Sequence, residues 1–106
     1  MLKATSLTWT KEVKESALPV VVDVSAAWCG PCRMMKPLIE NVEKDLEGKV
    51  RFVSLDADEE AELTREMRVS SIPCLILFNG GLEMDRVVGF SAEAAIKKWV
   101  EAGLKG

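Results

Sequence analysis

The apolar positions of the chain recur with two different periods, which predict strands and helices. Residues 20–24 are a beta-branched run with the nearly continuous apolar character expected where helices cover both faces of a sheet, and residues 50–55 predict a second strand. Over residues 31–46, apolar side chains recur every three or four positions, which predicts a helix. Pro37 lies inside this helix, and Gly48 is a natural stop for it. A strand, a helix and a second strand in this order predict a parallel pair with a right-handed crossover.

The N-terminal segment is predicted to contribute one short strand and one short helix. Residues 2–8 fit an edge strand. Thr8 or Thr10 is expected to cap the helix that follows, with Val13 and Ala17 on its inward face.

The C-terminal half is predicted to form a helix, a hairpin and a last helix. The acidic residues 56–62 are expected to form the first turn of a third helix, where carboxylates complement the helix dipole. Strands at residues 74–78 and 84–88 flank Asn79-Gly80-Gly81, a typical hairpin turn. Ser91 is expected to cap the final helix.

Taken in order, these elements predict an α/β fold. A mixed central β-sheet of about five strands is expected, flanked by four helices, with residues 1–106 forming a single domain. The formal net charge is −3 and no basic stripe is visible, which argues against nucleic acid or an anionic membrane as a partner. No secretory signal and no membrane-spanning apolar run are visible, so a cytoplasmic location is expected.

The candidate chemistry lies at Cys29 and Cys32, where the predicted strand at residues 20–24 leads into the long helix. Two thiols at this spacing can close a small-ring disulfide, and Cys-x-x-Cys beside a strand–helix pattern is typical of a redox pair. Unpaired N–H groups at a helix N-terminus favour an anion, so Cys29 is expected to be the nucleophile. This hypothesis requires Cys29 to be accessible from solvent. Cys32, one turn inward, is expected to resolve the mixed disulfide.

Two other interpretations of the cysteine pair are weaker. Unreactive core cysteines would not need Gly30 and Pro31 between them. A closed zinc site needs four ligands, whereas this chain has three cysteines and no histidine, so no metal is expected.

Asp23 is an ionisable residue inside an apolar strand. On a period of two, its side chain shares a face with Val21 and Ser25. If helices cover that face, desolvation raises the pKa of Asp23, and a carboxyl poised near neutrality can take the proton from Cys32. The alternative is an aspartate exposed at the end of a strand.

A series of landmarks runs along the chain: Asp23, Trp28-Cys29-Gly30-Pro31-Cys32, Pro37, Ile72-Pro73, the glycine-bearing hairpin and Gly89. Their order and spacing resemble the thioredoxin family over nearly the whole length. The resemblance implies a thioredoxin fold, a redox-active disulfide between Cys29 and Cys32, and a cis bond before Pro73. It also implies that the Ile72 backbone pairs with an extended substrate segment. The implied substrate-binding surface consists of Trp28, Gly30, Pro31, Ile72, Pro73 and Gly89, with ordinary core packing as the alternative for Trp28.

Three positions depart from the family's pattern. Many members have a lysine where this chain has Ser54, and a large aromatic residue where it has Ser25. Loss of a nearby cation should raise the pKa of Asp23, whereas water admitted beside a small Ser25 should lower it. Cys74 stands where relatives usually have threonine. It is interpreted as a buried small hydrophobe, with a regulatory thiol as the alternative.

These features predict a monomeric, general protein-disulfide reductase that exchanges a dithiol–disulfide pair with disulfide-containing client proteins. The Gly-Pro dipeptide between the cysteines resembles the reducing members of the family. No nucleotide fingerprint is visible, so no cofactor is expected, and the electrons should come from a separate thioredoxin reductase, flavin- or ferredoxin-linked. The alternatives are a disulfide isomerase or oxidase, and a thioredoxin-fold binding or structural module.

Overall fold

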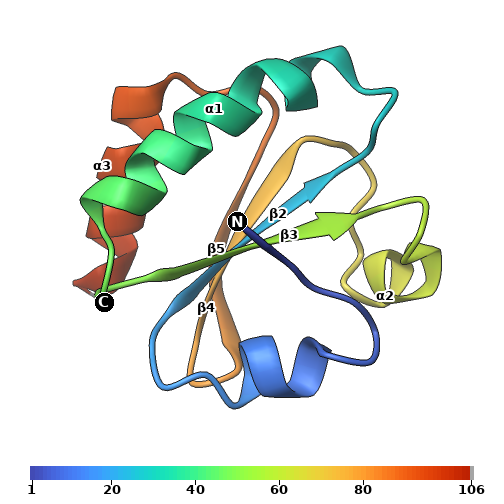
Figure 1. Ribbon diagram of the computed structural model, residues 1–106, viewed down its shortest axis with the longest axis horizontal. Coiled ribbons are helices and arrows are strands. Elements are labelled where there is room, and N and C mark those ends of the chain that lie inside the picture. The colour runs from blue at the N-terminus through green and yellow to red at the C-terminus, as the bar shows by residue number, and fades with distance from the viewer. Residues whose placement is uncertain (106) are drawn as a thin grey trace.

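The computed structural model describes residues 1–105 (Figure 1). Five strands form one mixed sheet in the order β1-β3-β2-β4-β5, in which β1, β3 and β2 run parallel while β4 and β5 add antiparallel pairs. The strands are β1 (Leu2–Lys3), β2 (Val20–Ser25), β3 (Arg51–Asp56), β4 (Cys74–Asn79) and β5 (Leu82–Val88). The helices are the short π-helix η1 (Thr10–Lys14), α1 (Gly30–Asp45), α2 (Ala61–Glu66) and α3 (Glu93–Leu104). The predicted mixed sheet with four flanking helices is confirmed, and Gly106 of the predicted domain lies outside the described residues.

Helices cover both faces of the sheet, which explains why its central strands are apolar almost throughout (Figure 1). Helices α1 and α3 lie on one face, over a core that includes Val21, Met35, Ile39, Leu75 and Val100. Helices η1 and α2 lie on the other, over a core that includes Trp9, Val13, Val22, Leu55 and Ile76. Among the helices described, none is long and apolar enough to cross a bilayer.

The short N-terminal helix differs from its expected form. No side chain caps η1, and the Thr8 hydroxyl instead accepts a hydrogen bond from the Thr5 N–H at 2.9 Å. The expected threonine cap is therefore wrong. Val13 is buried as predicted, whereas Ala17 lies beyond the helix and is exposed.

Two other expected helix starts are also wrong. Asp56 ends β3, and its Oδ1 accepts hydrogen bonds from the N–H groups of Asp58 and Glu59 at 2.9 and 3.0 Å. The acidic stretch therefore forms a turn before α2, because the side chain competes for backbone donors that a helix would use. Ser91 does not cap α3; its N–H donates to Met35 Sδ at 3.3 Å.

Helix α1 places the reactive end of the molecule. Cys29 occupies its N-cap position and Pro31 lies in its first turn, where a missing N–H costs nothing. The helix buries Met35, Ile39 and Val42 against the sheet and α3, so its N-terminus is held beside the end of β2.

Candidate active site

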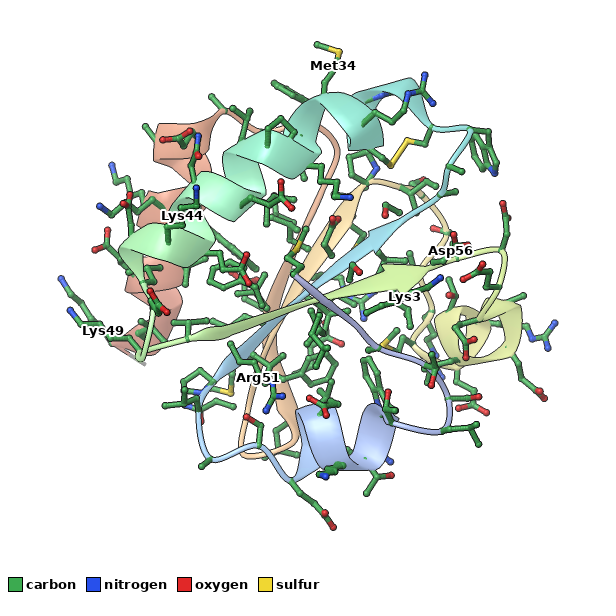
Figure 2. The ribbon with its side chains drawn as sticks, in the orientation of Figure 1. Lys3, Met34, Lys44, Lys49, Arg51 and Asp56 are labelled. Atoms are coloured by element: carbon green, nitrogen blue, oxygen red, sulfur yellow. A yellow bond between two sulfur atoms is a disulfide. The ribbon has the colours of Figure 1, made fainter. Side chains whose placement is uncertain are left out.

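Cys29 and Cys32 form a disulfide at the start of α1, with their Cα atoms 5.2 Å apart (Figure 2). The N–H of Cys32 donates to Cys29 Sγ over 3.2 Å. Cys29 Sγ therefore already occupies the position that receives the helix N-terminal donors. When the disulfide opens, the same donor and the helix dipole stabilise a thiolate at Cys29.

The two cysteines are buried to nearly the same extent. Cys29 retains 5% of its surface exposed and Cys32 retains 4%. The expectation that Cys29 is accessible from solvent is therefore wrong for the disulfide form, in which both cysteines pack with Ala26 and against Ile72. What distinguishes Cys29 is its N-cap position and the hydrogen bond that its sulfur accepts.

The loop before β4 and the end of β5 meet beside the disulfide. The peptide bond between Ile72 and Pro73 is cis, and Ile72 packs against the cysteine pair. The N–H of Gly89, just beyond β5, donates to the carbonyl oxygen of Pro73 over 2.8 Å. Residues that are far apart in sequence therefore gather around the two sulfur atoms.

Trp28 lies on the surface, so the core-packing alternative is wrong. Its side chain is 68% exposed, and its Nε1 donates to Asp58 Oδ2 over 2.8 Å. Met34 is 66% exposed and points away from α1 (Figure 2), adding apolar surface near the site that sequence analysis did not identify. Of the other expected surface residues, Pro31 is exposed and Pro73 is buried, while three are partly exposed: Gly30, Ile72 and Gly89.

Asp23 is buried on the face of β2 that α1 covers, with 3% of its surface exposed. Burial raises its pKa from 3.8 to about 6, and the charge of Lys36 opposes the rise. Ser54 lies directly opposite Asp23 on β3. Lys36 was missed by sequence analysis, although its position four residues after Cys32 places both on one face of the helix.

Cys74 is a free cysteine, and it is fully buried. It lies in the core under η1 and α2, and burial raises the pKa of its thiol. Its interpretation as a buried small hydrophobe is confirmed, while the regulatory role remains a prediction. A cavity of about 440 Å³ lies at the other end of β3, between Leu18 and Phe52, and contains none of the expected site residues.

Comparisons with known proteins agree with this geometry. The family model described as Thioredoxin matches residues 1–102. A thioredoxin of Rickettsia bellii is 40% identical over 96 residues, which cover 91% of each chain. One of Rickettsia felis is 37% identical over 100 residues, covering 94% of this chain and 95% of the relative. Thioredoxin 1 of a Nostoc species is 36% identical over 102 residues, covering 96% and 95%.

Proposed function

The chain belongs to the thioredoxin family, and from this premise we propose how its residues carry out disulfide exchange. The protein is a thiol–disulfide oxidoreductase that reduces protein disulfides. The single observation that carries the mechanism is the Cys29–Cys32 disulfide at the N-terminus of α1, with Cys29 Sγ accepting the N–H of Cys32.

In the first step, the reduced protein attacks its client. The Cys29 thiolate forms a bond to one sulfur of the client disulfide, and the client's S–S bond breaks. The client's other sulfur leaves as a thiolate and takes a proton from solvent. Cys29 is assigned this role because the helix N-terminus favours its ionised form.

In the second step, Cys32 resolves the mixed disulfide. Its thiol proton passes to the carboxylate of Asp23, and the Cys32 thiolate bonds to Cys29 Sγ while the bond from Cys29 to the client breaks. The second client sulfur leaves as a thiolate and is protonated. Two electrons have then passed from the cysteine pair to the client, and Asp23 holds a proton that it must return to solvent.

The client is proposed to bind on the surface around the disulfide. Trp28, Gly30, Pro31, Ile72, Pro73 and Gly89 form this surface. The exposure of Trp28 and Pro31, and the contact of Ile72 with the cysteines, support this assignment. An extended client segment running along the Ile72 backbone would bring its disulfide toward Cys29 by strand addition.

The electrons are proposed to come from a separate thioredoxin reductase, flavin- or ferredoxin-linked, because the cycle leaves Cys29 and Cys32 oxidised. The clients are proteins that contain disulfides. The monomeric state and the cytoplasmic location remain predictions.

Trapping of the mixed disulfide tests the assignment of the two cysteines. Cys32→Ser should accumulate a covalent adduct with a disulfide-containing substrate such as insulin. Cys29 can still attack the substrate disulfide, but the variant lacks the thiol that resolves the mixed disulfide. Cys29→Ser should form no adduct, and Cys74→Ser, the matched control, should reduce insulin at the unmodified rate. Adducts that form through Cys32 in Cys29→Ser would reverse the assignment, and insulin reduction that survives replacement of both cysteines would support the binding-module alternative.

The redox potential distinguishes a reductase from an isomerase or oxidase. The reduction potential is about −270 mV for thioredoxin and about −180 mV for protein disulfide isomerase. Equilibration of the Cys29–Cys32 pair with glutathione or dithiothreitol buffers gives this number directly. A value near that of the isomerase would overturn the direction of electron flow proposed here.

A further inference from the structure

Two hollows flank the buried carboxyl of Asp23. One, of about 290 Å³, extends toward Cys32 and Arg33, and the other, of about 220 Å³, extends toward Lys3 and Ser54. Each is large enough for several water molecules, since one water occupies about 30 Å³ in the liquid. Four residues line both hollows: Asp23, Ser25, Lys36 and Asp56.

The small side chains of this chain create these hollows. Ser25 lines both of them and Ser54 lines the second, and both are only partly buried. Asp23 has Ser54 on one side in the sheet and Leu75 on the other. Among residues 1–105, the charged groups that line the hollows around Asp23 come from α1, the end of β3 and the N-terminal segment.

Most of the charged groups around the hollows are engaged with other partners. Lys3 pairs with Glu59, the terminal amino group of Met1 pairs with Glu43, and Arg33 donates to the carbonyl oxygen of Ala27. The Asp56 carboxylate accepts two backbone N–H groups, and the Cys32 thiol is tied in the disulfide. Cys74, on β4, lies in the core of the opposite face.

Lys36 is the exception among the cations that line the hollows. Within residues 1–105 it forms no ion pair, and its exposed side chain lines both hollows together with Asp23. It lies one helical turn after Cys32, on the side of α1 that faces Asp23.

We propose that Lys36 is a positioning residue for disulfide exchange: it favours the carboxylate form of Asp23, and the hollows beside it let that carboxyl return its proton to solvent. This inference rests on the proposed role of Asp23 as the base for Cys32. In the balanced step, Asp23 takes the thiol proton of Cys32, and afterwards releases it to water, which regenerates the carboxylate. The lowering effect of Lys36 on the pKa of Asp23 agrees with this assignment.

The experiment compares the pH dependence of insulin reduction in Lys36→Gln, Lys36→Arg and Lys44→Gln. Lys44 lies on the same helix, far from the disulfide (Figure 2), so its substitution removes the same charge as a matched control. Lys36→Gln should raise the pKa that governs the rate by about 0.5–1 unit. At pH 6 the rate then falls about two- to fivefold, because fewer molecules carry the carboxylate, and above pH 8 it is unchanged. Lys36→Arg and Lys44→Gln should keep the original profile.

Introducing Lys36→Gln into the Asp23→Asn variant distinguishes the proposed role of Lys36 from the proposed role of Asp23. Lys36→Gln should produce no further shift there, because the group on which Lys36 acts is gone. A Lys36→Gln profile that matches the unmodified protein, or a shift that persists without Asp23, would overturn the inference about Lys36. If Asp23→Asn alone leaves rates unchanged across pH 6–9, the proposed role of Asp23 fails instead. NMR titration of the Asp23 carboxyl carbon in each variant reports the same shift without relying on activity.

Discussion

At the scale of single residues, the ionisation of Cys29 decides whether exchange proceeds at neutral pH. Its sulfur already accepts a helix N-terminal N–H. We expect the reduced Cys29 thiol to have a pKa below that of a free cysteine, because the helix N-terminus stabilises the thiolate. The rate of alkylation by iodoacetamide as a function of pH measures it, in a Cys74→Ser background to remove the third thiol. A pKa of 8.5 or higher would remove the physical basis for Cys29 as the attacking group.

The buried carboxyl of Asp23 is also expected to affect the free energy of unfolding. Burial raises its pKa from 3.8 to about 6, so the ionised form costs about 3 kcal/mol of folding free energy. The cost is absent well below pH 3.8, where the carboxyl is protonated in both the folded and the unfolded state, and it develops fully as pH rises through the folded-state pKa of about 6. Asp23→Asn should therefore raise the free energy of unfolding by about 1–3 kcal/mol at pH 7.5 and by little at pH 4. Urea denaturation of the oxidised protein at pH 7.5 and at pH 4 measures this difference. An equal effect of Asp23→Asn at both pH values would contradict the prediction.

At the scale of elements, Arg86 joins β5 to the C-terminal end of α2. Its guanidinium donates to the carbonyl oxygens of Met67 and Arg68 over 2.8 and 3.3 Å, and to both carboxylate oxygens of Glu83 at 2.6 Å. These donors satisfy carbonyls that a helix end leaves without partners.

Arg86→Met should therefore lower the free energy of unfolding by about 1.5–3 kcal/mol. Lys97→Met is the control, because the Lys97 contact with Asp45 spans 3.4 Å between exposed side chains and is expected to contribute at most about 1 kcal/mol. Urea denaturation at neutral pH measures both. Equal losses would mean that Arg86 stabilises the protein no more than a surface ion pair does.

The hairpin between β4 and β5 gives a matched pair of glycines. Gly80 and Gly81 have φ of +61° and +81°, so an alanine at either position costs about 1–2 kcal/mol of backbone strain. Only at Gly81 would the added Cβ also meet a neighbour, the carbonyl oxygen of Lys14 at 2.9 Å. We expect Gly81→Ala to lower the thermal midpoint more than Gly80→Ala, measured by circular dichroism. The same loss in both variants would show that the turn can move away from Lys14.

At the scale of the whole molecule, one sheet links the cores on its two faces. Strands β2 and β4 contribute side chains to both cores, so neither core can be lost alone without exposing these strands. The single-domain prediction for residues 1–106 therefore leads us to expect one cooperative unfolding transition. Calorimetry checks it: the ratio of calorimetric to van't Hoff enthalpy should be close to one. Two separate transitions would show that the faces unfold independently.

The alternation of strands and helices could be predicted because it depends on local patterns. The apolar run at residues 20–24 and the helical spacing that follows it each correspond to one observed element. The residues at which η1, α2 and α3 begin, Thr10, Ala61 and Glu93, were harder to predict. Threonine, aspartate and serine near these starts have several backbone groups within reach, and the surrounding fold decides which they bind.

The sequence by itself determined the chemistry at Cys29 and Cys32, because the spacing of the thiols and their place before a helix are local properties. Only the tertiary structure decided the environment of that chemistry. It places Lys36 and the two hollows beside Asp23, and it seats Ile72 and Gly89 at the disulfide. The physical reason is that desolvation and the electrostatic interaction between charges depend on distances through space, which join residues that the linear sequence separates.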